Sequence, residues 1–502
     1  STHNVYAFLP GYVEAAYLHA AHLALAPALT PDGLSGFLAP GGQPALAAQF
    51  LGVGLTMLAA WFTAAFASTL AGRVGLTDRA PVGVIAGVFV LLTPWTQAVG
   101  SMAYNEPGVL ALGAGALLAA AAPGLPPARR VTLVAFLLGA AGGCKPTAVP
   151  FLAPGAAILM AASAPPRRWI PMFALAAVVG AATLAPWLLR NAVYAGNPVF
   201  PHANGLLGHA HWTAEQSARY AAAHAFQGSP ADGLATLFLP AAEPGAPAVV
   251  RWRGLTNSQR AVTPALAALG LVALLATPAC RRTGLALTGA IAAGLGAWLF
   301  FTHLQSRFLI PLLPLFAGAI ALGAAALPAR ARPLIALATA VSGAWSVANF
   351  AAQRHADPNG LLVLGTGVFT GALSIPGLGD QVPWAGVNET VPPGETLLLV
   401  GDATPFYLRR PLLYATTWDA HPLAEAMRRH PGEPRAWSRD LYDAGVRWVL
   451  VAPGELARLA ASGWTDPLLT PERVAGWCDT LGDPVRAWPD HGRALYRLRS
   501  EP

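Results

Sequence analysis

The sequence predicts a polytopic α-helical membrane protein with a small α/β domain at its carboxyl end. Only 11% of its 502 residues are charged and 55% are hydrophobic, whereas soluble domains are about 25% charged. Ten apolar runs are long enough to cross about 30 Å of hydrocarbon. After residue 350 these runs give way to short β-like segments.

Paired arginines set the expected orientation of the spans, because they lie in every second connection, as is typical of cytoplasmic loops. The expected spans are 45–71, 81–99, 107–122, 131–143, 146–163, 169–189, 261–278, 283–301, 308–327 and 333–350. The arginine pairs are Arg73 and Arg79, Arg129 and Arg130, Arg167 and Arg168, Arg281 and Arg282, and Arg330 and Arg332. The remaining connections, and everything after residue 350, are therefore expected outside.

This alternation also places residues 1–25 outside, and no preceding span or signal peptide in the sequence explains how they cross the membrane. We therefore expect a preceding helix and the first outer loop to be missing. Residues 10–26 are apolar enough to cross the membrane, which would reverse the alternation, but Glu14, His19 and His22 favour a helix that lies along the outer surface. Glu14 is also one of two candidate catalytic carboxylates. The membrane domain is expected to cover residues 1–350.

An extracytoplasmic α/β domain is predicted for residues 351–502. The β-like runs 395–402, 411–418 and 446–453 alternate with the helical stretches 422–429, 440–445 and 455–463, a pattern typical of a parallel sheet. The region contains neither GxGxxG nor a P-loop. We expect a cap docked on the membrane domain.

Composition also bounds the ligands. The net charge of +7 is assigned to cytoplasmic loops, so no nucleic acid is expected as a partner. Cys144, Cys280 and Cys478 lie in separate regions without CxxC spacing and are expected to be packing residues. No cofactor or metal site is predicted, and a divalent metal stays an open alternative.

Lys145 is the only lysine of the chain, which has 31 Lys plus Arg. It lies at an expected helix break, where Pro146 prevents continuation and Gly142 and Gly143 allow close approach. An ionisable group at membrane depth costs several kcal/mol and tends to line a site. A cation at such a break suits a phosphate. The alternative is a side chain that reaches for the outer interface.

Other polar residues are expected on the same side. Glu106, the second candidate catalytic carboxylate, begins the span at 107–122 beside Tyr104 and Asn105, a cluster suited to sugar hydroxyls. The alternative is that Glu106 only caps the helix. Arg307 opens a span and Arg190 closes one; either can simply anchor a helix end. Together with Lys145 they favour an anionic ligand.

The outer segment 211–226 is predicted to be helical, because Thr213 and Gln216 have capping-box spacing. Gln216, Tyr220 and His224 would share one face. Such a helix can roof a polar cavity or dock on a surface. The full set of candidate substrate-binding residues is Tyr104, Asn105, Asn191, Arg219, His224, His303 and Gln305.

The motifs NVYAFLP, TPWTQAVGSMAYNE, GCKPTAVP, APWLLRNAVYAGNPVFP and HLQSRFLIPLLP occur in the order seen in GT-C superfamily glycosyltransferases. Residues 1–350 resemble the lipid-carrier-dependent group that includes the lipid A aminoarabinose transferases and protein O-mannosyltransferases. The resemblance implies a GT-C-like helical bundle in the bacterial inner membrane. It also implies inverting transfer of a sugar from a polyprenyl-phosphate donor to an acceptor on the outer face, with membrane lipids around it.

The resemblance also implies roles for individual residues. Glu106 is similar in position to the family's second acidic residue, and Lys145 and Arg307 to bases near the carrier phosphate. The family's acidic first loop would lie before Ser1. Two other functions stay open: a transporter or flippase of an anionic lipid or solute, and a non-catalytic protein that binds a sugar-lipid.

Overall fold

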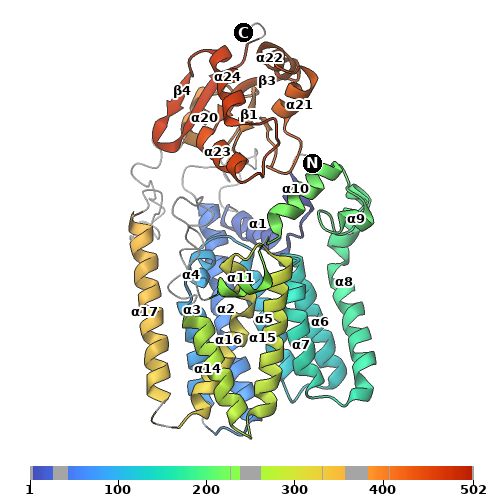
Figure 1. The fold of residues 1–502 in the computed structure, drawn as a ribbon, viewed down its shortest axis with the longest axis vertical. Coiled ribbons are helices and arrows are strands. Elements are labelled where there is room, and N and C mark those ends of the chain that lie inside the picture. The colour runs from blue at the N-terminus through green and yellow to red at the C-terminus, as the bar shows by residue number, and fades with distance from the viewer. Residues whose placement is uncertain are drawn as a thin grey trace.

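A helical bundle carries the α/β domain at one of its ends, and the amino-terminal segment lies at the junction of the two (Figure 1). This computed structural model describes residues 4–25, 43–77, 79–226, 228–237, 262–328, 330, 332–356, 383–405 and 408–499. The predicted boundary at residue 350 falls inside helix α17, which continues to Ala356. Residues 357–382 of the predicted α/β domain lie outside the described residues.

Each expected apolar run contains helix. The elements of the bundle are α2 (Gln43–Arg73), α3 (Ala80–Leu92), α4 (Pro94–Gly100), α5 (Glu106–Ala121), α6 (Pro127–Cys144), α7 (Ala148–Ala161), η3 (Pro166–Arg168), α8 (Trp169–Ala195), α14 (Val262–Ala276), α15 (Arg281–Phe301), η4 (Ser306–Leu312), α16 (Leu313–Ala326) and α17 (Arg332–Ala356). Shorter elements cover the end near the α/β domain: η1 (Val5–Phe8), α1 (Tyr12–Leu25), α9 (Asn204–Leu207), α10 (Ala214–His224) and α11 (Pro230–Ala235).

The described helices make this a multi-pass membrane protein, with fewer spans than predicted. Four helices are long and apolar enough to cross a membrane: Ala47–Arg73, Pro166–Ala195, Arg281–Phe301 and Ser306–Ala326. The pair α3 and α4 would make a fifth. Several others are shorter, such as α7 with 14 residues, against the roughly 20 that a straight crossing needs. The prediction of ten spans therefore exceeds what helix length supports in the described part of the chain.

The predicted span 81–99 is broken. Helices α3 and α4 meet at an angle of 63°, and Thr93 between them has an extended backbone with φ −72° and ψ 125°. The following residue is Pro94, which has no amide hydrogen and disfavours helical geometry in the residue before it. A run that is apolar throughout therefore changes direction at one proline.

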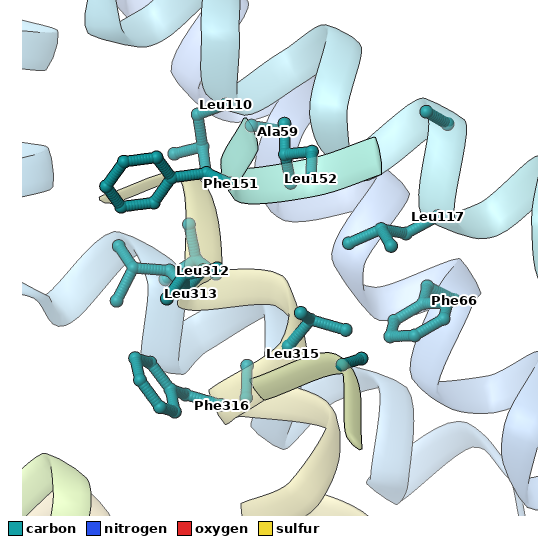
Figure 2. Close-up of a cluster of buried hydrophobic side chains, with 14 of the residues drawn as sticks. Ala59, Phe66, Leu110, Leu117, Phe151, Leu152, Leu312, Leu313, Leu315 and Phe316 are labelled. Carbon is teal, nitrogen blue, oxygen red and sulfur yellow. The ribbon is translucent and has the colours of Figure 1, made fainter. Parts of the chain in front are cut away.

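Helices α2, α5, α7 and α16 share the largest apolar core. Phe66, Leu117, Leu152 and Leu315 point into it from different helices (Figure 2), and each is at most 1% exposed to solvent. Lipid is as apolar as these side chains, so close packing rather than escape from water holds such helices together. At the contact of α14 with α16, a Cβ on Gly323 would lie 2.2 Å from the Cα of Gly270. Only glycine permits this approach.

The α/β domain contains a five-stranded mixed sheet. Its strands are β1 (Thr396–Val400), β2 (Leu412–Leu413), β3 (Val446–Val451), β4 (Arg486–Trp488) and β5 (Arg493–Arg497), in the order β2-β1-β3-β5-β4. Its helices are α20 (Pro383–Thr390), α21 (Pro422–Arg429), α22 (Pro434–Asp443), α23 (Pro453–Ala461), η6 (Pro489–His491) and α24 (Pro471–Leu481).

The prediction of a purely parallel sheet is wrong in one half. Strands β2, β1 and β3 are parallel as expected, whereas β5 is antiparallel to both β3 and β4. Strands β4 and β5 are short and carry arginines, and a three-residue turn of helix joins them. A short connection of this kind can only join antiparallel strands.

Asp419, in the loop after β2, fastens the α/β domain to the membrane domain. Its carboxylate accepts hydrogen bonds from the Val5 amide at 2.8 Å and from Trp212 Nε1 at 2.8 Å. His211 Nε2 lies at 3.3 Å, and the Thr416 hydroxyl also donates to it. Burial raises the pKa of Asp419, but hydrogen bonds from His211, Thr416 and Trp212 outweigh burial and hold that pKa below its usual value. The domain is docked, as expected for a cap.

Candidate functional site

A pocket of about 850 Å³ opens at the end of the bundle that faces the α/β domain. We call it the main pocket. It is built by η1, the turns before α5 and α7, the start of η4, and helix α10. Its lining includes these polar and aromatic residues: Tyr6, Tyr104, Asn105, Glu106, Lys145, Thr147, His202, Asn204, His209, Ser217, Tyr220, His224, Thr302, His303, Arg307 and Phe308.

Three charged residues meet at the floor of the main pocket. Lys145 Nζ lies 2.8 Å from Glu106 Oε1, and Arg307 Nε lies 4.0 Å from the same oxygen. The Glu106 side chain is 3% exposed, whereas those of Lys145 and Arg307 are 18% and 25% exposed. The floor therefore holds two cations against one carboxylate, and the cations are the more accessible partners. A surplus of positive charge suits an anionic ligand.

Local sequence explains where Lys145 and Glu106 sit. Lys145 follows the last residue of α6, with an extended backbone at φ −157° and ψ 120°, as expected for a residue before proline. Helix α7 begins three residues later, so the predicted break is present. Glu106 is the first residue of α5, and Pro107 follows it in the first turn. A carboxylate is favoured there by the helix dipole.

The glycines before Lys145 serve packing rather than ligand access. A Cβ on Gly143 would lie 2.2 Å from the ring of Tyr12, and one on Gly142 would lie 2.7 Å from the side chain of Val149. The Tyr12 hydroxyl donates a hydrogen bond to the Thr183 carbonyl at 2.6 Å. The space that the sequence assigned to a backbone or ligand is thus taken by Tyr12 of α1 and by Val149 of α7.

Aromatic rings enclose the two cations. Lys145 Nζ lies 4.4 Å from the ring centroid of Phe308, and the Arg307 guanidinium lies 5.3 Å from the same centroid. The Tyr104 ring lies 5.5 Å from Arg307. Rings at such distances attract a cation and keep water from its flank. Phe308 therefore positions both cations.

Several buried polar atoms at the floor lack partners. Among the described residues, Glu106 Oε2, Asn105 Oδ1 and Arg307 Nε are buried and have no hydrogen bond. Buried polar groups in proteins are nearly always paired, so each unpaired one calls for an explanation. Two acceptors and one donor at one site can bind a ligand that carries both hydroxyls and an anionic group.

Imidazole and aromatic rings form one wall of the main pocket. The ring centroids of His224 and His303 lie 5.6 Å apart, and that of Tyr220 lies 4.1 Å from His224. Phe308 lies 5.3 Å from His303. Burial lowers the pKa of His224, although its ring also interacts with the Tyr220 carbonyl, which raises it. Burial therefore favours the neutral form of His224 in this wall of rings.

This lowered pKa predicts a loss of stability in acid. The folded chain resists protonation of His224, so the stability gained from the neutral ring is present above the ordinary value of 6.5 and is lost as the pH falls below it. We expect the melting temperature to drop between about pH 7.5 and pH 5, and His224→Phe to show a smaller drop. Differential scanning fluorimetry of both proteins measures this. An equal drop in both would contradict the assignment.

Two of the predicted residues lie outside the main pocket. Asn191 is fully buried, and its Nδ2 donates to the carbonyls of Phe8 at 2.8 Å and Phe200 at 3.1 Å. Arg190 Nη2 donates to the Leu9 carbonyl at 3.0 Å. Both side chains hold the amino-terminal segment, whose residue Leu9 lines the main pocket. They support the pocket from behind rather than face a ligand.

Three further predicted residues are also peripheral. Glu14 Oε1 lies 3.5 Å from Asn105 Nδ2, beside the main pocket but not in its lining. Arg219 lies on α10, and neither Arg219 nor Gln305 is in the lining of the main pocket. The backbone carbonyl of Gln305 accepts a hydrogen bond from Trp298 Nε1 at 3.0 Å. Tyr104, Asn105, Glu106, Lys145, His224, His303 and Arg307 are brought together by the fold.

The predicted helix over 211–226 is confirmed in part and has two functions. The Thr213 and Gln216 capping box is present, and the helix runs over Ala214–His224. Gln216 Nε2 donates to the Trp418 carbonyl at 3.1 Å, so this residue docks on the α/β domain. His224, two turns later on the same face, lines the main pocket. One face of this helix thus both covers the main pocket and docks on the α/β domain.

Some lining residues were not singled out from the sequence. Asn204 Nδ2 donates to the Ser217 hydroxyl at 3.0 Å, and His209 Nδ1 lies 2.9 Å from the same oxygen. Tyr6 lies within the motif NVYAFLP, and Phe308 directly follows Arg307, so the motifs around these two residues could have identified them as lining residues. Ser217 lies within the predicted helical segment 211–226, whereas Asn204 and His209 lie in none of the motifs and meet Ser217 only because the outer segment returns to α10. No group of three His, Cys, Asp or Glu that could hold a metal ion occurs in the described ranges.

Comparison with known proteins supports the fold. Two crystal structures of ArnT from Cupriavidus metallidurans match this chain, one in the apo state with a TM-score of 0.50 and one bound to undecaprenyl phosphate with a TM-score of 0.52. In both cases the identity is 15%, and the match covers 96% of this chain and 87% of ArnT. No protein-family model matches, and no curated protein sequence matches. The predicted fold class, a helical membrane bundle with a carboxyl-terminal α/β domain, is therefore confirmed, and the fold is ArnT-like.

Proposed function

We propose that the chain is a lipid-carrier-dependent glycosyltransferase, which moves a sugar from a polyprenyl-phosphate donor to a hydroxyl group of an acceptor. The observation that carries this proposal is the pair of cations, Lys145 and Arg307, that converge on the buried Glu106 in a polar pocket. The fold adds support, since one of the matching ArnT structures is bound to undecaprenyl phosphate.

The proposed reaction is a single displacement with inversion at the anomeric carbon. The acceptor oxygen forms a bond to that carbon while the bond to the phosphate oxygen breaks, and its electron pair leaves with the phosphate. Lys145 and Arg307 stabilise the negative charge that grows on the phosphate. The acceptor proton passes to a carboxylate. The reaction needs no nucleotide.

Two carboxylates are available to take this proton. Oε1 of Glu106 is occupied by Lys145, but its Oε2 has no partner among the described residues. Glu14 is exposed and reaches the pocket only through Asn105. We assign Glu106 to orient the cations and to accept the proton at Oε2, and Glu14 to the second position.

The proposed sidedness places the main pocket and the α/β domain on the outer face of the bacterial inner membrane. The paired arginines lie at the other ends of the helices that form the pocket: α6 and α15 each begin with an arginine pair and end at the pocket. A bias of this kind is typical of cytoplasmic loops. Residues 1–350 would form the membrane domain and residues 351–502 the outer domain.

Glu106→Gln and Glu14→Gln test the proton acceptor. In purified full-length protein supplied with a radiolabelled polyprenyl-phosphate sugar, we expect Glu106→Gln to reduce transfer by about 100-fold or more, since general bases contribute about 10²–10⁴. Glu14→Gln should reduce it by about tenfold or less. Release of polyprenyl phosphate is measured by thin-layer chromatography. The opposite order would assign the base to Glu14, and donor binding without any release would favour a binding protein.

A further inference from the structure

A second pocket, of about 530 Å³, lies in the α/β domain at the carboxyl edge of its parallel strands. We call it the sheet-edge pocket. Residues 401–404 follow β1, residues 415–421 follow β2, and residues 452–456 follow β3, and each of these segments contributes to the lining. Figure 1 shows α23, the helix after β3, at the end of the domain that faces the bundle.

The strand order gives this edge its hollow. From β1 the chain continues to β2 on one side, whereas β3, on the other side of β1, leads on to β4 and β5. The connections therefore leave β1 and β3 in opposite directions. In open α/β sheets, ligands bind in the crevice outside the carboxyl ends of strands where the order reverses in this way.

The charges that line the sheet-edge pocket are internally balanced. Asp402 is paired with Arg493 at 2.7 Å, and Asp419 is paired with His211 and hydrogen-bonded to its other donors. The carboxylate of Asp466 is held by Arg428. Glu455, the fourth lining carboxylate, is paired with Arg458. Among the described lining residues, Arg493 is the only arginine or lysine, and its pairing with Asp402 leaves no such side chain over for a phosphate. This pocket therefore differs from the main pocket in the charge of the ligand that it suits.

Hydroxyl groups supply the remaining polarity. Four threonines line the pocket: Thr404, Thr416, Thr417 and Thr465. The Thr417 hydroxyl is buried and has no hydrogen-bond partner among the described residues. A buried hydroxyl without a partner is destabilising, because it has lost its hydrogen bonds to water without replacing them. A ligand that offers hydroxyl groups without a net charge would pair with it and with the carboxylates.

The two pockets share one lining side chain. Tyr6 lines both of them. Its hydroxyl accepts a hydrogen bond from Trp418 Nε1 at 3.1 Å. The Trp418 ring lies 5.3 Å from that of His224 in the wall of the main pocket. A molecule seated at the sheet edge thus lies next to the site of proposed sugar transfer.

We infer that the sheet-edge pocket binds a neutral, hydroxyl-rich glycan portion of the acceptor, which then presents its reacting hydroxyl to the main pocket past Tyr6. That this glycan belongs to the acceptor rests on the proposed function. That the pocket binds a neutral saccharide rests on the sheet-edge pocket alone. The two parts can therefore fail separately.

Gly454→Trp tests the binding by filling the pocket. A Cβ on Gly454, which lines the pocket at the start of α23, would meet no atom within 4 Å, so a large side chain can enter without displacing the backbone. Ala457→Trp is the matched control, because Ala457 lies on the same helix, is exposed and does not line the pocket. Thr417→Val removes only the unpaired hydroxyl.

The probes are the methyl glycosides of glucose, galactose, mannose and arabinose, with glucose 6-phosphate as the anionic comparison, added to the full-length protein in nanodiscs. Saturation-transfer difference NMR measures binding. We expect at least one neutral glycoside to bind, Gly454→Trp to weaken it by about tenfold or more, Thr417→Val by about threefold to tenfold, and Ala457→Trp by less than about twofold. Absence of any binding that depends on Gly454, or tighter binding of glucose 6-phosphate, would overturn the inference.

Donor turnover separates this inference from the proposed function. If Gly454→Trp raises the KM for the acceptor while hydrolysis of the polyprenyl-phosphate sugar by water is unchanged, both stand. If turnover is absent but saccharide binding depends on Gly454, the transferase proposal fails and a glycan-binding site remains. If turnover is present and neither saccharide binding nor the acceptor KM responds to Gly454→Trp, the inference fails alone.

Discussion

Lys145→Gln is expected to lower the rate of sugar transfer by about 100-fold to 1000-fold, the usual effect of removing one donor that stabilises a developing anion. The amide that replaces the ammonium group is uncharged, so one of the two cations proposed to stabilise the phosphate is lost. The measurement is kcat with a radiolabelled polyprenyl-phosphate sugar. Arg281→Gln is the control and should leave kcat unchanged, because Arg281 lies at the end of α15 that is away from the main pocket.

The same substitution also leaves Glu106 buried without its closest partner. Breaking a buried ion pair from one side destabilises a protein by about 3–5 kcal/mol, whereas neutral replacement of both partners is far less costly. The double variant Lys145→Gln with Glu106→Gln should therefore regain thermal stability but not transfer. Recovery of transfer together with stability would show that the pair only holds the helices, and the catalytic assignment of Lys145 would then be abandoned.

Asp419→Ala is expected to loosen the junction between the two domains. The substitution leaves the Val5 amide and Trp212 Nε1 without their acceptor, and an unpaired buried donor costs about 1–3 kcal/mol. With the contacts to His211 and Thr416 also lost, we expect the junction to be weakened by about 3–5 kcal/mol. Thermal unfolding of the full chain measures this change, as does the rate at which limited proteolysis cleaves the chain between the two domains.

Asp440→Ala is the matched control for this prediction. Asp440 is paired with Arg429 at 2.7 Å on a partly exposed face of the same domain, and such pairs contribute about 0–1 kcal/mol.

Because the pKa of Asp419 lies below its ordinary value of 3.8, the stabilising effect of Asp419 is present above that value and is lost only as the pH falls below it. Equal melting temperatures for Asp419→Ala and Asp440→Ala would refute the role of Asp419 as a fastener.

The break at Lys145 and the helix over 211–226 could be predicted because their signals are local. Pro146 stops one helix, and Thr213 with Gln216 starts another. The sheet was harder. Strands β1 to β3 were recognisable as apolar runs, whereas β4 and β5 are only three and five residues long, carry arginines, and owe their pairing to the edge of β3.

For the candidate site, the sequence identified the residue types and their expected side, and the fold selected among them. Arg190 and Arg307 look alike as lone bases at helix ends. Only Arg307 lines the main pocket, because η4 brings it within 4.0 Å of Glu106. Arg190 is turned toward the Leu9 carbonyl by the course of the amino-terminal segment. That course depends on contacts between residues about 180 positions apart.

The sequence by itself determined that this protein is helical and membrane-embedded, and where helices break. It also determined which end of the bundle carries the paired arginines. Each of these features follows from composition or from neighbours along the chain. Only the tertiary structure decided which polar residues meet. The pocket joins five segments of the chain, and the free energy of bringing them together is spread over packing contacts that no local pattern records.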